Sequence, residues 1–348
     1  MKWFEHHNAR SIGEAVELLN HYQGKAKVNA GGTDLLGTLR DRIHPDYPDA
    51  VINIKTIEGL DYIRTGEEGL KIGALAKLAD IAAASTVKDE YNLLADAARS
   101  VATPHVRNMA TIGGNLAQEV RCCFYRYPRQ IGGPIVCLRK GGKHCPALAG
   151  ENRYHSIFGP APLTEGRDVG QGSGVSDVPS YPSTARKGCF AVSPSDIAVA
   201  LMALDARIVT TSRIVPARHF FKATATSSTV LEADELIREI QVPKPPVGAR
   251  QKYEKFTLRR PIDFAIVSVA SMVTFGDGVW KDARIVLGAV APEPVRVRNA
   301  EEIIRGQTVG EEPAREAAEH SVAGARPLRM NAYKLEIART LVRRSLLG

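Results

Sequence analysis

The cysteines are the side chains of this chain best suited to redox or metal chemistry. Cys122, Cys123, Cys137 and Cys145 lie close together in the sequence, and Cys189 follows a stretch rich in Gly and Pro. Structural zinc sites favour two close cysteine pairs, whereas no spacing here forms a CxxC pair. Iron–sulfur clusters are held by four thiolates and tolerate longer intervals. These residues leave three interpretations open: an iron–sulfur cluster, unrelated buried cysteines, and a zinc site.

The segment 122–189 needs something to hold it in place, because it shows little periodicity and such long irregular stretches are uncommon in compact domains. A metal centre on four of the cysteines would do so. Adjacent Cys122 and Cys123 cannot readily reach one corner of a cluster, so one of them is expected to be spare. Basic side chains nearby would offset the charge of a thiolate-bound cluster, or form a solvated basic loop: Arg121, Arg126, Arg139, Lys140, Lys143 and His144.

Two glycine turns could admit a phosphate group or a flavin edge against bare backbone. They are Ala30-Gly-Gly-Thr-Asp34 and Thr111-Ile-Gly-Gly-Asn115. The first lies between a predicted strand and a predicted helix, where free backbone N–H groups can hold an anion. Neither turn matches GxGxxG, so a Rossmann dinucleotide site is poorly supported. The two turns predict a ligand held between two loops, with tight structural turns as the alternative.

Two charged residues farther along the chain could contact a bound cofactor. Asp196 lies in the first turn of a predicted helix, where it could accept a hydrogen bond from a ribose or a flavin. Lys255 lies on a predicted strand, where its ammonium group could stabilise a reduced, anionic flavin. An ordinary helix-start acid and a surface lysine are the alternative interpretations.

Composition limits the class of protein. The chain has 348 residues, a size that predicts two or three domains, and a formal net charge of +8. No nucleic-acid-binding motif accompanies the positive charge, so no nucleic-acid partner is expected. No apolar run is long enough to cross a bilayer, and the first residues show no export signal. We therefore expect a cytoplasmic protein with reduced thiols.

The hydrophobic periodicity predicts an α/β organisation up to about residue 220, with a capping box at Ser11–Glu14. Helices are expected at 12–22, 34–42, 78–84 and 88–102, and after Ser193 and Pro194, which are placed at a helix start. Strands are expected at 26–29, 50–54, 70–74 and 206–211.

The rest of the chain predicts a strand meander followed by helices. Strands are expected at 237–242, 252–258, 265–275 and 282–289, and helices at 298–304, 312–323 and 331–346. A boundary near 220–240 then separates the α/β half from an α+β domain, with 244–248 as a connection.

Four motifs occur in an order that resembles a known family. They are AGGTDLL from Ala30, RNMATIGGNL from Arg107, SPSDIAVALMALDA from Ser193 and KFTLRRPIDFAIVSVA from Lys255. Together they resemble the FAD-binding medium subunits of the molybdenum hydroxylases, the xanthine dehydrogenase and carbon monoxide dehydrogenase family. The cysteine-rich insertion resembles that of the 4-hydroxybenzoyl-CoA reductase beta subunit and of the periplasmic aldehyde oxidoreductase flavin subunit, which carry an extra 4Fe-4S cluster. The stretch 155–187 is longer than this resemblance leads us to expect.

The resemblance implies an α+β fold: a vanillyl-alcohol-oxidase-type FAD-binding domain of two α/β subdomains, and a C-terminal α+β domain. The implied bounds are 1–55 and 56–230 for the subdomains, with an iron–sulfur insertion at about 120–190, and 240–348 for the C-terminal domain. The implied FAD-binding residues are Asn29, Ala30, Gly31, Gly32, Thr33, Asp34, Leu35, Leu36, Val101, Thr111, Gly114, Asn115, Asp196, Ile237 and Lys255. The implied 4Fe-4S ligands are Cys122, Cys137, Cys145 and Cys189.

The resemblance also implies an electron-transfer subunit without the substrate site. A large molybdopterin-binding subunit would transform the substrate, and a small 2Fe-2S subunit would complete a heterotrimer, which can itself dimerise. Ferredoxin is an implied external partner. Two other functions remain open: a self-sufficient FAD-dependent oxidoreductase of the same fold, and a zinc-stabilised binding module.

Overall fold

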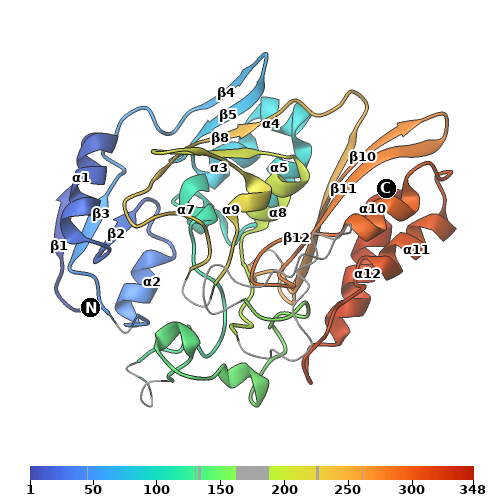
Figure 1. The fold of residues 1–348 in the computed structure, drawn as a ribbon. Helices are drawn as coiled ribbons and strands as arrows, with labels where there is room; N and C mark the ends of the chain where they lie inside the picture. The colour runs from blue at the N-terminus through green and yellow to red at the C-terminus, as the bar shows by residue number, and fades with distance from the viewer. Residues whose placement is uncertain (45, 130, 132–134, 162–187, 225–226, 261) are drawn as a thin grey trace.

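The computed structural model describes residues 1–44, 46–129, 131, 135–161, 188–224, 227–260 and 262–348. Within them the chain forms three β-sheets, which follow one another from the N-terminus to the C-terminus (Figure 1). The stretch 155–187, which is longer than the resemblance leads us to expect, lies mostly outside the described residues. No helix of the described part is long and apolar enough to cross a membrane.

The first sheet is parallel and has the strand order β1-β3-β2. It contains β1 (Glu5–Asn8), β2 (Ala26–Asn29) and β3 (Ala50–Asn53), joined by helices α1 (Ile12–Tyr22) and α2 (Leu35–Arg40). Strand β1 was not predicted, because its residues are polar and mostly exposed. The first glycine turn follows β2 directly and leads into α2, as the sequence predicted.

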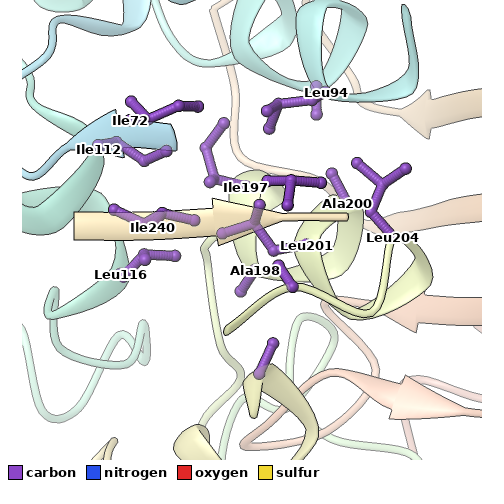
Figure 2. Close-up of a cluster of buried hydrophobic side chains, with 14 of the residues drawn as sticks. Ile72, Leu94, Ile112, Leu116, Ile197, Ala198, Ala200, Leu201, Leu204 and Ile240 are labelled. Carbon is purple, nitrogen blue, oxygen red and sulfur yellow. The ribbon is translucent and has the colours of Figure 1, made fainter. Parts of the chain in front are cut away.

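The second sheet is antiparallel and has the order β4-β5-β8-β6-β7. Its strands are β4 (Ile63–Gly66), β5 (Gly69–Gly73), β6 (Arg207–Thr210), β7 (Ile214–Pro216) and β8 (Ile237–Val242). The helices of this part are α3 (Leu78–Ala83), α4 (Ser85–Glu90), α5 (Asn92–Ser100), α6 (Pro104–Arg107), α7 (Ile112–Leu116), α8 (Asp196–Ala203) and α9 (Ala217–Phe220). Helix α8 is apolar on every side. Figure 2 shows why: Ile197 and Leu201 of α8 pack among Ile240 of β8 and neighbouring helices.

The third sheet is antiparallel, with the order β12-β11-β10-β9. It comprises β9 (Arg250–Phe256), β10 (Val267–Gly276), β11 (Val279–Gly288) and β12 (Val295–Arg296), and is followed by α10 (Arg298–Ile304), α11 (Glu311–His320) and α12 (Tyr333–Leu347). A separate buried cluster, which includes Trp280 of β11 and Val342 of α12, holds the sheet and helices together. The predicted helices of this part are confirmed to within a few residues.

Three details of the prediction were wrong. The strand 237–242 was grouped with the C-terminal meander, but β8 pairs with β5 and β6 and belongs to the second sheet. The helix predicted over 88–102 is two helices, because Tyr91 leaves the helical region at φ −129° and buries its ring in the core. Helix α8 is capped by Ser195, whose hydroxyl accepts the Ala198 N–H, rather than by Ser193. The predicted domain bounds 1–55, 56–230 and 240–348 stay predictions.

The segment that carries the cysteines has little regular structure and lies at the bottom of Figure 1, between the N-terminal part and the C-terminal helices. It contains the short 3-10 turns η1 (Leu138–Lys140) and η2 (Pro146–Leu148). Isolated bridges pair Arg121 with Val192 and Ala161 with Cys189. The described parts of this segment are therefore fixed at both ends by the residues that precede α8.

A buried lysine attaches this segment to the C-terminal domain. Lys334 of α12 is 1% exposed, and its Nζ donates to the carbonyls of Tyr154, His155 and Ala289. Its three donors are thus matched by three acceptors, as burial of an ammonium group requires.

Replacement of this lysine should loosen the junction. Lys334→Met would leave the Tyr154 and Ala289 carbonyls without a donor, while the His155 carbonyl would keep the Asn331 amide. We expect a loss of about 2–4 kcal/mol in the free energy of unfolding. Urea titration of the purified variant measures it. The control is Lys281→Met, which changes a half-exposed lysine of the same domain. Equal stability of the two variants would contradict a structural role for Lys334.

Candidate cofactor-binding site

A cavity of about 500 Å³ lies between the two glycine turns and the start of α8. It brings together segments from all three sheets. All the predicted cofactor-binding residues except Asn29 and Leu36 line it: Ala30, Gly31, Gly32, Thr33, Asp34, Leu35, Val101, Thr111, Gly114, Asn115, Asp196, Ile237 and Lys255. Leu36 is instead about half exposed, at 49%.

The first turn presents unused backbone donors to the cavity. The N–H groups of residues 30–34 have no hydrogen-bond acceptor within the described parts of the chain. Gly32 adopts φ +72°, which favours glycine, and this allows the chain to turn between β2 and α2. A series of free N–H groups beside a helix start is an anion-binding arrangement.

The second turn packs directly against the first. A Cβ on Gly31 would lie 2.3 Å from the carbonyl oxygen of Met109, so only glycine allows the two backbones this close. Thr111 caps α7, because its hydroxyl accepts the Gly114 N–H at 3.2 Å. The two motifs, which are far apart in the sequence, therefore form one continuous wall of the cavity.

Asn115 is oriented by a residue that the sequence analysis did not select. The Ser195 hydroxyl accepts the Ala198 N–H and donates to Asn115 Oδ1 at 2.6 Å. This bond occupies the carbonyl oxygen of the amide and leaves its NH₂ group as the available donor. Asn115 lines the cavity, so it can present that donor to a ligand.

Asp196 and Lys255 form a buried ion pair, with Lys255 Nζ 2.6 Å from Asp196 Oδ2. Lys255 also donates to the Ser100 carbonyl, and the Tyr253 hydroxyl donates to Asp196 Oδ1. Burial and the Asp196 charge raise the pKa of Tyr253 well above its usual value. Tyr253 was missed, although its two-residue spacing from Lys255 on a strand places both side chains on one face. Lys255 is therefore not an isolated cation, since Asp196 balances its charge.

Asp34 connects the first turn to the cysteine segment. Its carboxylate accepts hydrogen bonds from Arg121 at 2.7 Å and from both terminal nitrogens of Arg126 at 2.8 and 3.1 Å. Burial alone would raise the pKa of Asp34, but Arg126 and Arg121 hold it below its usual value. The two arginines, which the sequence suggested as neutralising charges for a cluster, thus neutralise this carboxylate.

Four cysteines gather next to this network. Cys137 and Cys189 are buried in one apolar cluster with Tyr125, and Cys122 packs against it. Cys145 lies close enough for the charges of Cys137 and Cys189 to raise the pKa of its thiol, after the larger effect of burial. Cys123 is exposed, and none of the five cysteines forms a disulfide. These are the four cysteines that the resemblance selected.

One histidine contacts this group of sulfurs. His155 is 2% exposed, and its Nε2 lies 3.2 Å from Cys122 Sγ. Burial, with a contribution from Lys334, lowers the pKa of His155 to about 4. Within the described residues, no three Cys, His, Asp or Glu side chains converge as a single metal ion requires.

Comparison with protein families decides the identity of the chain. Residues 2–245 match the FAD-binding domain in molybdopterin dehydrogenase, and residues 251–348 match the CO dehydrogenase flavoprotein C-terminal domain. The chain belongs to the FAD-binding medium subunits of the molybdenum hydroxylases. It is therefore an oxidoreductase subunit with FAD as its cofactor, and its fold is the α+β arrangement of that family.

Individual relatives agree with this assignment along the whole chain. The aldehyde oxidoreductase FAD-binding subunit PaoB of Escherichia coli is 31% identical, over 97% of this chain and 96% of its own. The carbon monoxide dehydrogenase medium chain of Hydrogenophaga pseudoflava is 29% identical, over 99% of this chain and 96% of its own. The solved carbon monoxide dehydrogenase of that organism superposes with a TM-score of 0.73 at 27% identity, over 99% of this chain and 96% of that chain.

The first turn provides a sharp test of where FAD binds. Gly31→Ala would force a Cβ against the Met109 carbonyl and separate the two turns. We expect at least about a tenfold lower affinity for FAD, since one displaced wall removes several charge-assisted hydrogen bonds. The absorbance ratio of flavin to protein after gel filtration measures it.

The matched control is Gly37→Ala in α2, where an added Cβ meets nothing within 4 Å. It should keep its full FAD content. If both variants retain FAD equally, the cofactor does not depend on contact between the two turns.

Proposed function

We propose that this chain is the FAD- and iron–sulfur-containing electron-transfer subunit of a heteromeric molybdenum enzyme, similar to the 4-hydroxybenzoyl-CoA reductase beta subunit. One observation carries the proposal: the cavity lined by the two glycine turns and the group of four cysteines both adjoin the Asp34 ion-pair network. FAD exchanges two electrons with one side and single electrons with the other. An adjacent one-electron centre would use that property.

In this proposal the FAD pyrophosphate binds the free N–H groups of residues 30–34, together with Thr111, Gly114 and the Asn115 amide. Asn29 and Leu36 do not line the cavity. Their side chains lie next to Gly32 and would support the turn. Val101 and Ile237 would flank the isoalloxazine ring, and the paired Asp196 and Lys255 would lie beside it. We also propose that residues up to about 230 form the two subdomains of a vanillyl-alcohol-oxidase-type domain.

The proposed cluster is 4Fe-4S, with Cys122, Cys137, Cys145 and Cys189 as its ligands. A four-iron cluster fills the space between its thiolates, so its ligands stand farther apart than those of a single metal ion. Cysteines that lie near one another without converging on one point suit this arrangement. The exposed position of Cys123 makes it the spare cysteine.

The surroundings of these cysteines also suit a redox cluster. His155 can donate a hydrogen bond to Cys122 Sγ, and such bonds tune the reduction potential of a cluster. The Tyr125 N–H is directed at the same sulfur, 3.5 Å away. The buried Arg139 and the partly buried Lys140 lie beside the Tyr125 ring, and their positive charge would offset that of four thiolates.

The two alternative functions fit the structure less well. A zinc-stabilised module needs converging ligands, which the described residues do not supply. A self-sufficient oxidoreductase needs a free acid or base beside the flavin. Glu119 in the cavity wall is bound by Tyr125, and Glu235 by Thr210 and Arg213, so these carboxylates are engaged elsewhere.

The names of the relatives support a division of labour between subunits. They include FAD-binding subunits and medium chains of larger enzymes. We propose that a large molybdopterin-binding subunit transforms the substrate and that a small 2Fe-2S subunit passes electrons to FAD, in a heterotrimer that can dimerise. A cytoplasmic location suits five free thiols and is part of the same proposal.

We further propose an acidic one-electron partner such as ferredoxin. The formal net charge of +8 would attract it over long distance. Electron exchange between the purified chain and a ferredoxin, followed by stopped flow, should therefore slow several-fold as salt is raised to physiological strength. A rate that does not respond to ionic strength would contradict this electrostatic encounter.

The ligand assignment predicts a clear difference between adjacent cysteines. Cys122→Ser and Cys189→Ser should each lose most of the iron, because a cluster needs four thiolates, and should keep FAD. Cys123→Ser is the matched control and should keep both. Iron and acid-labile sulfide are assayed on the same sample as flavin absorbance. Iron content that is unchanged in Cys189→Ser, or lost only in Cys123→Ser, would overturn the assignment.

A further inference from the structure

A second, smaller cavity adjoins the cavity proposed for FAD and has a volume of about 250 Å³. It is lined by Lys2, Arg42, His44, Tyr47 and Arg129, which come from the N-terminus, the loop after α2 and the cysteine segment. His44 lines both cavities, so the two share a wall. Neither the FAD assignment nor the proposed cluster uses the other four residues.

The charge of this cavity is unbalanced. Its lining holds three permanent cations, Lys2, Arg42 and Arg129, and no carboxylate. None of these cations has a carboxylate within ion-pair distance in the part of the chain that the structure describes. By contrast, the neighbouring Arg40 is paired with Asp41 at 2.9 Å. Lys2 and Arg129 are exposed and Arg42 is partly buried, and a bound anion would neutralise this group of cations.

Two buried polar atoms in the lining also lack partners. Arg42 Nε and Tyr47 Oη are inaccessible to solvent and have no hydrogen-bond partner in the described structure. Such groups are rare in folded proteins, because burial without a hydrogen bond costs free energy. Both atoms can donate a hydrogen bond, and both belong to side chains that line the cavity.

The backbone holds these groups in place. Arg42 has φ +50°, a strained value for a residue other than glycine, and its N–H is bound to the Leu39 carbonyl. The Arg129 N–H donates to the Asp41 carbonyl at 3.1 Å, which brings the cysteine segment beside this loop. Lys2 Nζ lies 5.8 Å from the centroid of the Tyr47 ring. The cationic lining is therefore built from three separate segments that are fixed against one another.

We propose that this cavity binds the phosphate group of a small soluble ligand, separately from FAD. The planar guanidinium groups of Arg42 and Arg129 match the geometry of phosphate oxygens, and Tyr47 and Lys2 supply further donors. The volume suits orthophosphate or the phosphate end of a mononucleotide.

Calorimetric titration of the FAD-loaded chain tests this site. Inorganic phosphate and adenosine 5′-monophosphate are titrated separately, at constant ionic strength kept with chloride. We expect saturable binding of one ligand per chain. Tighter binding of phosphate would identify the free anion as the natural ligand, and tighter binding of the nucleotide would identify a nucleotide phosphate.

Amino-acid substitutions test whether the phosphate binds in this cavity. Arg42→Gln and Arg129→Gln should each weaken it by roughly tenfold, because each removes a charge-assisted contact, and Tyr47→Phe should weaken it less. The control Lys25→Gln removes an equal charge from the exposed surface of the same sheet and should leave binding unchanged. FAD content, read from flavin absorbance, should stay constant in all four variants, which separates this site from the FAD site.

Three results would overturn the proposal: no saturable heat with either ligand, equal affinity in Arg42→Gln and Lys25→Gln, or binding that chloride alone abolishes. A further arm repeats the titration on the assembled multisubunit complex. If the complex does not bind phosphate although the free chain does, the cations belong to a subunit interface and the small-ligand site is wrong.

Discussion

The arrangement of both proposed redox centres depends on the carboxylate of Asp34. This residue ends the turn whose free N–H groups face the cavity proposed for FAD, and an unpaired carboxylate there would repel a pyrophosphate. Arg121 and Arg126 neutralise it, and both belong to the segment that leads into the cysteines. These pairs are partly buried, and such a pair adds little net stability, whereas loss of one partner leaves the other charge unpaired. The pairs therefore act mainly to fix the cysteine segment against the cofactor turn.

A second buried pair does the same at the other end of the cavity. Asp196 begins α8, which belongs to the part matched as the FAD-binding domain, and Lys255 lies on β9 in the C-terminal part. Their contact, with the Tyr253 hydroxyl on the same carboxylate, joins the two parts across the cavity. The C-terminal part thus completes the wall of the cavity that we propose for FAD.

Much of this site could be predicted, because glycine turns depend on local backbone chemistry. Gly31 and Gly32 stand where a close approach and a positive φ require them, and a sequence shows such positions directly. The partners of these residues could not be predicted in the same way. Arg126 lies 92 residues from Asp34, and nothing in the local pattern of either residue specifies the contact. The helix break at Tyr91 escaped prediction for a related reason: core packing interrupts a helix that periodicity alone would continue.

The cysteine segment shows even more strongly that local sequence does not specify long-range contacts. Composition marked it as a stretch that needs an anchor, and the structure supplies anchors that the sequence did not reveal, such as Lys334 on the Tyr154 and His155 carbonyls. Four cysteines spread from 122 to 189 come into one region, as their spacing alone could not establish. The cluster that we propose there is the central claim about this subunit.

The most direct measurement is the metal and flavin content of the purified wild-type chain, taken with its visible absorption spectrum. Our account predicts one FAD per chain together with about four irons and about four acid-labile sulfides, as a 4Fe-4S centre requires. Flavin without iron would contradict the iron–sulfur assignment and leave the cysteines a structural role. Zinc without flavin would contradict the redox function altogether.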